Sequence, residues 1–178
     1  MTAAYIGIGS NILPERFILM ALERLNQSLT VTAVSSFYRT KAVGTAAGQQ
    51  DFINGMIAVE TELSAHQLKF QVLREIEYEL GRLKEMPKFA PRKIDLDLVL
   101  FGDQLISELN IPEPDILNRP YVYVPLLDIA PKIKLPGSDI KLKKQLKRSA
   151  ENDQKKCIKG KTLSYLNGTE FKVHELIM

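Results

Sequence analysis

The chain has 178 residues, of which 45% are hydrophobic and 25% charged, and its net charge at pH 7 is only +3. A chain of this length can bury one sizeable core without dividing, so we expect a single small enzyme domain. No apolar run approaches the length of a membrane span. The lone Cys157 excludes an internal disulfide framework and agrees with a cytoplasmic location. So small a net charge does not call for a polyanionic partner, and the positive excess is local to residues 141–161.

The first elements predicted along the chain are a strand and a helix. The apolar run from Ala4 to Ile8 predicts a buried strand that ends at the turn Gly9-Ser10-Asn11. Pro14 is expected to begin the helix, because proline is favoured at the first helical position. The apolar residues that follow it recur at helical spacing, which indicates a helix with one buried face.

Two strands, a second helix and a further strand are predicted next. Residues 31–39 and 52–62 are strands by their β-branched and aromatic content, and a long loop separates them. Ser64 and Gln67 form the pattern of a capping box, so a helix is expected to begin there. A second loop then leads to a strand at 95–101. This order predicts an α+β fold, a ferredoxin-like βαββαβ sandwich with a mainly antiparallel sheet covered by helices.

The strand at 95–101 carries two acids that indicate a metal site. Side chains alternate faces along a strand, so Asp95 and Asp97 project to the same side, roughly 7 Å apart at about 3.3 Å of rise per residue. Mg²⁺ bound to polyphosphate takes a few carboxylates together with substrate oxygens. The alternative is that the two acids simply face water, as most acids do. The side chains expected on the opposite face, toward the core, are Ile94, Leu96, Leu98 and Leu100.

The usual phosphate-binding loops are absent from the sequence. There is no G-x-x-x-x-G-K-[ST] motif, and Gly7-x-Gly9 lacks the third glycine of a dinucleotide fingerprint. A plain turn at the end of a strand is the better interpretation of those glycines. Neutralisation of phosphate would therefore need cations. Any one candidate taken alone is more often a solvated surface charge, but their concentration around the acidic strand favours a joint role. The candidate side chains are Arg74, Arg82, Lys84, Lys88, Arg92 and Arg119.

The stretch from Lys88 to Val99 resembles the signature of the 6-hydroxymethyl-7,8-dihydropterin pyrophosphokinase family. The matching positions include Pro91, Arg92 and the pair Asp95-Leu96-Asp97. Further blocks occur in the family's order, and the resemblance covers roughly residues 4 to 137. These blocks are Ala4 to Asn11, Ser35 to Thr40, Asp51 to Asn54, Glu77 to Arg82, and Asn118 to Tyr121 with Pro125-Leu126.

The resemblance implies transfer of pyrophosphate from ATP to the hydroxymethyl group of 6-hydroxymethyl-7,8-dihydropterin, with release of AMP, in folate biosynthesis. The enzyme class is 2-amino-4-hydroxy-6-hydroxymethyldihydropteridine diphosphokinase, with Mg²⁺, expected as two ions, and ATP as cosubstrate. The catalytic residues implied are Arg82, Arg92, Asp95 and Asp97, of which Asp95 and Asp97 would bind the metal. The ATP-binding residues expected are Arg74, Glu77, Lys84, Lys88 and Arg119. The pterin-binding residues implied are Thr40, Val43, Gly44, Phe52, Asn54 and Tyr121.

Some of these residues also have purely structural interpretations. Glu77 could be a helix-surface partner of Arg74, and Phe52 and Tyr121 could be ordinary core residues. The chain as a whole could be a non-catalytic nucleotide-, pterin- or nucleic-acid-binding protein on the same scaffold. Several positions depart from the family's usual residues, and they bear on ATP binding and on loop geometry. These are Lys41 in place of proline, Phe52 without a hydroxyl, Glu85 in place of a base, Phe89 in place of tryptophan, and Glu113 in place of histidine.

The family resemblance fades beyond about residue 136. We expect residues 1–137 to form the catalytic domain and 138–178 a basic C-terminal extension packed on it. Asn167-Gly168 is a strong turn signal and predicts a hairpin at 162–173. The expected partners are ATP and a pterin alcohol, without a membrane or a nucleic acid, in a monomer or a weak homodimer.

Overall fold

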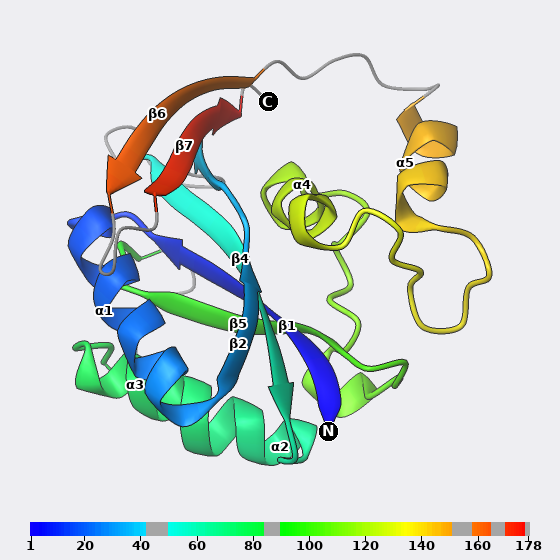
Figure 1. Ribbon diagram of the computed structural model, residues 1–178, viewed down its shortest axis with the longest axis horizontal. Helices are drawn as coiled ribbons and strands as arrows, with labels where there is room; N and C mark the ends of the chain where they lie inside the picture. The colour runs from blue at the N-terminus through cyan, green and yellow to red at the C-terminus, as the bar shows by residue number, and fades with distance from the viewer. Residues whose placement is uncertain (42–49, 84–89, 151–157, 165–169, 177–178) are drawn as a thin grey trace.

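Alternating apolar residues build the centre of a mixed sheet. In the computed structural model, which describes residues 1–41, 50–83, 90–150, 158–164 and 170–176, seven strands form one sheet with helices on both of its faces (Figure 1). The strands are β1 (Thr2–Ser10), β2 (Thr30–Val34), β3 (Phe37–Thr40), β4 (Phe52–Thr61), β5 (Asp95–Phe101), β6 (Ile158–Ser164) and β7 (Glu170–Leu176). The helices are α1 (Pro14–Ser28), α2 (Ala65–Gln67), the π-helix η1 (Leu68–Leu73), α3 (Arg74–Glu79), the 3-10 helix η2 (Ser107–Leu109), α4 (Pro120–Ile129) and α5 (Leu142–Ala150).

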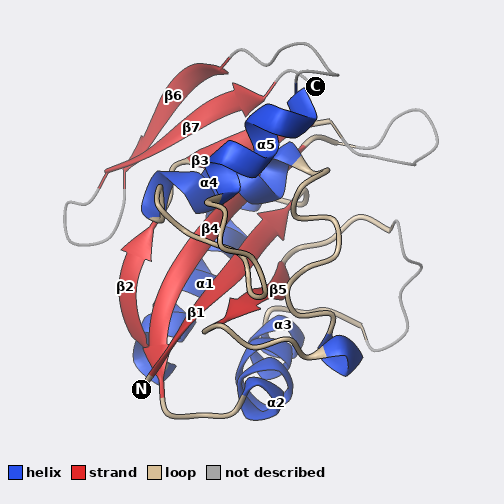
Figure 2. Cartoon of the chain, turned by 90° about the vertical axis from the view of Figure 1, so that its right-hand side faces the viewer, coloured by secondary structure: helices blue, strands red, loops and turns tan. Residues whose placement is uncertain are grey.

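The order of the strands across the sheet is β5-β1-β4-β3-β7-β6, and β2 pairs with β4 beside this path. All pairs are antiparallel except that of β3 with β7, which is parallel. Figure 2 shows α4 and α5 in front of the sheet and α1 behind it. The expected ferredoxin-like α+β class is confirmed. None of the helices in the described part of the chain has the length and apolar character that crossing a bilayer needs.

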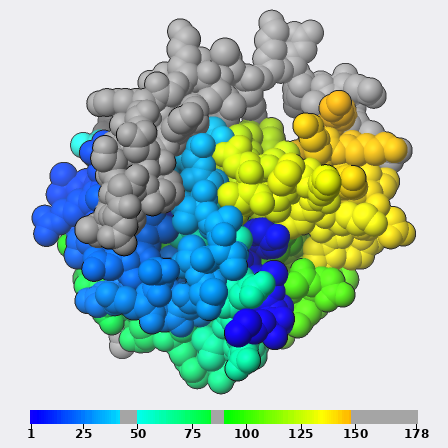
Figure 3. Space-filling view, viewed as in Figure 1, coloured from blue at the N-terminus to red at the C-terminus, as the bar shows by residue number. Residues whose placement is uncertain are grey.

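Each face of the sheet has its own apolar core. Ile6 of β1 and Ile57 of β4 pack with α1 and η1 on one face, and Met56 of β4 packs with Leu126 of α4 on the other. All four side chains are fully buried. In Figure 3, α1 and β2 (blue) and the segment around α4 (yellow) form neighbouring parts of one outer face.

The local signals for the helices are confirmed. Pro14 stands in the first turn of α1. The Ser64 hydroxyl accepts from the Gln67 N–H at 3.2 Å, while the Gln67 side chain accepts from the Ser64 N–H at 2.9 Å, which is the predicted capping box. The helix that begins there runs through α2, η1 and α3, so its middle section is wider than a regular α-helix.

Two strand predictions need correction. The strand expected at 31–39 is interrupted, because the Ser35 hydroxyl accepts from the Met56 N–H at 2.8 Å where a strand carbonyl would normally do so. Leu100 does not share the face of Leu96 and Leu98. A register shift in the pairing of β1 with β5 inserts Val99 as an extra residue, so Leu100 joins the core beneath α4.

The C-terminal segment adds two strands to the sheet. β6 and β7 pair antiparallel over residues that include most of the predicted hairpin, and the turn residues 165–169 lie outside the described ones. β7 then runs alongside β3, with Phe37 opposite Val173 and Arg39 opposite Glu175. The extension therefore continues the sheet beyond the strand that leads to Thr40.

Candidate active site

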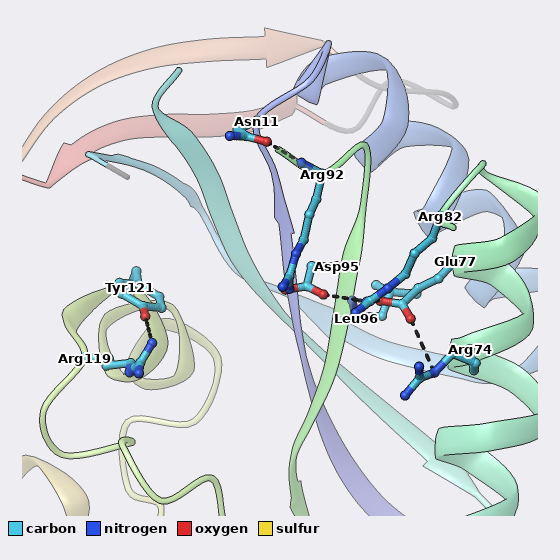
Figure 4. Close-up of polar contacts among 9 residues, drawn as sticks. All are labelled: Asn11, Arg74, Glu77, Arg82, Arg92, Asp95, Leu96, Arg119 and Tyr121. Atoms are coloured by element: carbon cyan, nitrogen blue, oxygen red, sulfur yellow. Dashed lines mark hydrogen bonds and ion pairs between the residues drawn. The ribbon is translucent and has the colours of Figure 1, made fainter. Parts of the chain in front are cut away.

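The carboxylate of Asp95 lies between two guanidinium groups at the start of β5 (Figure 4). Arg82, which follows α3, donates to Oδ1 at 2.7 Å, and Arg92, from the segment before β5, donates to Oδ2 at 2.5 Å. The three side chains are only about one-fifth exposed, at 18 to 20%. Hydrogen bonds between ionised partners in such a partly dry setting are strong, so the acid and both arginines are held in fixed positions.

Glu77 ties α3 to the acidic strand. It is 2% exposed, and its Oε1 accepts from the backbone N–H of Leu96 at 2.9 Å and from Arg82. Its Oε2 lies 3.8 Å from Nε of Arg74. Burial raises the pKa of Glu77, while the Leu96 N–H and the charge of Arg82 oppose that rise. Both oxygens are therefore engaged within the protein, so contact between Glu77 and a nucleotide stays a prediction.

Asp97 lies two residues farther along β5, on the same face as Asp95. Loss of hydration and repulsion by the negative charges of Asp95, Glu77 and Glu113 raise the pKa of Asp97 to about 7. Because the Asp97 side chain is exposed to solvent, we attribute the raised pKa mainly to repulsion by the neighbouring carboxylates. A cation between the carboxylates would relieve it.

The donor set fits Mg²⁺ bound to a phosphate substrate. Among the described residues, no group of three or more His, Cys, Asp and Glu side chains could hold a metal ion by itself. Mg²⁺ does not need such a group, because it keeps several waters and binds through one or two carboxylates together with substrate phosphates. Asp95 and Asp97 offer that number of carboxylates.

Two glycines of β1 separate the acids from the strand that carries Asn54. Gly9 pairs with Asp95 on one side and with Asn54 on the other. Directly paired residues share a face of a sheet, so the three form a row across its surface. A Cβ on Gly9 would lie 2.8 Å from Oδ1 of Asn54, so a side chain at this position would displace that amide. Gly7 pairs with Asp97 on one side and with Met56 on the other.

The structure brings three of the expected pterin-binding residues together. The Asn54 side chain donates to the Thr40 hydroxyl at 2.8 Å, and Thr40 pairs with Phe52 across β3 and β4. The Phe52 ring lies 3.9 Å from the position that a Cβ on Gly9 would occupy, which places it beside Asn54. Val43, Gly44, Lys84 and Lys88 were also expected at the site, and they lie outside the described residues.

Arg119 and Tyr121 form a separate pair at the start of α4. The Nε of Arg119 donates to Asp115 at 2.7 Å, and its Nη1 donates to the Tyr121 hydroxyl. Figure 4 shows this pair apart from the group around Asp95. Tyr121 lies on the same side of the sheet as Asn54, because Met56, two residues beyond Asn54, packs in the core beneath α4.

Asn11 belongs to the site region, although the sequence placed it only in a turn and in the first block of the family resemblance. It is 1% exposed, accepts from the Arg92 N–H at 2.7 Å and donates to the Gln50 carbonyl at 3.4 Å. Its own N–H donates to the Arg92 carbonyl at 3.0 Å. The sequence signal was an asparagine in the turn Gly9-Ser10-Asn11 after a strand, which does not reveal contacts with residues 39 and 81 positions away.

The sequence is similar to those of known proteins over most of its length. The family model for 7,8-dihydro-6-hydroxymethylpterin-pyrophosphokinase (HPPK) matches residues 5–131. The chain is 38% identical over 145 residues to the 2-amino-4-hydroxy-6-hydroxymethyldihydropteridine pyrophosphokinase of Haemophilus influenzae, covering 79% of this chain and 89% of that protein. It is 34% identical over 139 residues to the Aquifex aeolicus protein of the same name, covering 76% and 85%.

Solved structures show the same fold. The crystal structure of wild-type Plasmodium falciparum HPPK-DHPS with pteroate superposes with a TM-score of 0.66 at 11% identity. The match covers 85% of this chain and 45% of that one, so this chain spans less than half of the longer protein. From the family match and the two bacterial relatives, we conclude that the chain belongs to the HPPK family.

Proposed function

We propose that this chain transfers the terminal pyrophosphoryl group of ATP to the hydroxymethyl group of 6-hydroxymethyl-7,8-dihydropterin and releases AMP. The observation that carries the proposal is the row across the sheet, in which Gly9 alone separates Asp95 from Asn54. Groups suited to phosphate and metal thus lie beside groups suited to a flat heterocycle. The hydroxymethyl oxygen would bond to the β-phosphorus as the bond from that phosphorus to the α-phosphate oxygen breaks. AMP would leave with that oxygen, and the hydroxyl proton would pass to solvent.

Asp95 and Asp97 are the residues that would hold Mg²⁺, as two ions in the form that the resemblance implies. When bound, Mg²⁺ would neutralise phosphate charge and favour in-line displacement. Support comes from the two carboxylates on one strand face and from the repulsion that raises the pKa of Asp97.

Arg82 and Arg92 would bind the phosphate oxygens. In the structure each donates to one oxygen of Asp95, which leaves a further lone pair on each oxygen for a metal. On binding, the metal would neutralise Asp95 while the phosphates receive the guanidinium groups, so charge would be balanced at both. A planar guanidinium can hold two oxygens at once, which suits the alignment of a pyrophosphoryl group. Arg74, Lys84, Lys88 and Arg119 would add positive charge around ATP.

Phe52, Asn54 and Thr40 would form one wall of the pterin site. An amide both donates and accepts hydrogen bonds, as the edge of an aminopyrimidinone does, and the Phe52 ring offers a face for stacking. Tyr121 of α4 would take the other face of the ring. The comparisons do not favour the alternative of a non-catalytic binding protein, since the named relatives are pyrophosphokinases.

The test is AMP formation from ATP, measured with and without the pterin alcohol and with and without EDTA. We expect AMP in step with consumption of the pterin alcohol, and none after the metal is removed. Asp97→Ala should abolish turnover while the fold persists, and the matched control Asp103→Ala, in the exposed turn after β5, should not. AMP formation that needs neither the pterin alcohol nor Asp97 would refute the proposal.

A further inference from the structure

One hydrogen bond links the pterin side of the sheet to helix α4. The hydroxyl of Tyr38, on β3, donates to Oδ2 of Asp128, in the last turn of α4, at 2.5 Å. The two residues are 90 positions apart in the sequence. Tyr38 is only 3% exposed, whereas Asp128 is exposed. Burial and then the hydrogen bond and charge of Asp128 raise the pKa of Tyr38 well above its usual range, so the phenol remains a donor.

Tyr38 lies directly beside the residue that we assign to the pterin edge. It pairs with Asn54 across β3 and β4, and Thr40, which accepts from Asn54, comes two residues later on the same strand. Paired and alternate residues share a face, so all three side chains lie on the side of the sheet that α4 covers.

Asp128 is on the helix that carries the second ring of the proposed slot. It lies seven positions after Tyr121, which is about 10 Å along an α-helix at 1.5 Å per residue. The bond to Tyr38 therefore fixes one end of α4, and Tyr121 extends from the other end. A small rotation about the fixed end would move Tyr121 toward or away from Asn54.

The character of Asp128 indicates that the contact has a purpose beyond packing. A negative charge in the last turn of a helix opposes the helix dipole, so an acid there is unfavourable by itself. Apolar packing already holds α4, since Leu126 is fully buried in the core beneath it. Apolar contacts are non-directional, however, and they allow a helix to slide or rotate, whereas a short hydrogen bond does not.

We propose that Tyr38 and Asp128 are positioning residues that fix α4 against β3 and β4, so that Tyr121 and Asn54 engage the pterin together. The inference rests on the proposed pterin site. Neither residue would touch the substrate. Their effect would be on alignment, and a displacement of about 1 Å can lower a rate on the order of a hundredfold.

The experiment compares substrate affinities in variants that remove or keep the hydrogen bond between Tyr38 and Asp128. Tyr38→Phe deletes only the hydroxyl, and we expect the KM for the pterin alcohol to rise on the order of tenfold. The KM for ATP should stay within about twofold of the wild type, because Arg119 is the only proposed ATP-binding residue at α4, whereas Asp95, Asp97, Arg82 and Arg92 lie on β5 or before it. Asp128→Ala should match Tyr38→Phe. Asp128→Asn, whose amide oxygen still accepts, should remain close to the wild type.

A double-mutant cycle completes the test. If the two residues act through one bond, Tyr38→Phe combined with Asp128→Ala should cost no more than either change alone. An unchanged KM for the pterin alcohol, equal losses for both substrates, or additive effects in the double variant would each overturn the inference while the proposed function stands. A wild type that binds no pterin would overturn the proposed function, and this inference with it.

Discussion

The backbone N–H of Arg92 donates a 2.7 Å hydrogen bond to the side-chain oxygen of Asn11, which is 1% exposed. A buried amide in the turn after β1 thus holds the backbone at the point where the chain enters the acidic strand. The same amide reaches Gln50, just before β4. One side chain therefore joins the approaches to both halves of the proposed site.

Asn11→Ala should destabilise the fold and lower turnover. It leaves the partly buried N–H of Arg92 without its side-chain acceptor, which costs about 1–3 kcal/mol of unfolding free energy. Turnover should fall because Arg92 is no longer held in place. Denaturant unfolding and AMP formation measure the two effects, with Asn26→Ala, at an exposed position of α1, as the matched control. A variant as stable and active as the control would contradict the role given to Asn11.

Arg92→Lys should lower kcat by about 10- to 100-fold, although the positive charge is retained. A lysine ammonium cannot hold two oxygens in a fixed plane, so alignment of the phosphates is lost. Steady-state kinetics with both substrates would measure the loss. The control is Arg24→Lys, because Arg24 forms a 3.3 Å ion pair with Glu79 at more than 50% exposure. Equal kcat values for the two lysine variants would count against phosphate binding by Arg92.

Asp97→Asn should have opposite effects on turnover and on stability. Turnover should fall by about a hundredfold or more, because a charged oxygen of the metal site is lost. The metal-free protein should become more stable at pH 8, since the variant removes the repulsion that raises the pKa of Asp97. Thermal unfolding in EDTA, compared with the Asp103→Asn control, measures the second effect. A less stable metal-free variant would show that Asp97 makes a favourable contact instead.

Gly9→Ala should weaken binding of the pterin alcohol and leave ATP binding nearly unchanged. The added methyl would lie 2.8 Å from Oδ1 of Asn54, so the amide must move away from its place beside Thr40. We expect the KM for the pterin alcohol to rise on the order of tenfold. In an Asn54→Ala background the same change should cost little more, because the clash is gone. A full additional loss in that background would mean that Gly9 acts by another route.

The phenol of Tyr38 should resist ionisation in alkaline solution. Burial, followed by the hydrogen bond and charge of Asp128, raises its pKa above the usual 10.0. A folded-state pKa above the unfolded one means that Tyr38 contributes stability below pH 10, which is lost as the pH rises through the folded value. Phenolate absorbance of the wild type and of Tyr38→Phe should therefore coincide until the wild type unfolds. An extra phenolate in the native wild type near pH 10 would contradict this assignment.

The predictions that succeeded from sequence rested on neighbouring residues. The capping box at Ser64 and the helix start at Pro14 are local patterns that tertiary contacts had no reason to override. The proposed proximity of Asp95 to Asp97 likewise follows from strand periodicity alone.

The features that were missed depend on contacts between distant segments. The predicted face of Leu100 was wrong because the bulge in β5 arises from its pairing with β1, and the sequence of β5 alone does not indicate it. The break at Ser35 depends in the same way on Met56 of the neighbouring strand. The bonds of Asn11 to Arg92 and of Tyr38 to Asp128 join residues 81 and 90 positions apart. A polar residue that is buried by such contacts cannot be distinguished from a solvated one in the sequence.

The parallel pairing of β7 with β3 decides which backbone groups this protein presents to other molecules. Without that strand, β3 would offer a row of free amides and carbonyls next to Thr40, and such a row is a template for association with another chain. The C-terminal hairpin occupies that position and transfers the outer edge to β6, whose sequence contains Lys159 and Lys161. Lysine-bearing edges discourage strand-to-strand aggregation. Loss of the last two strands should therefore show itself first as poor solubility at high protein concentration.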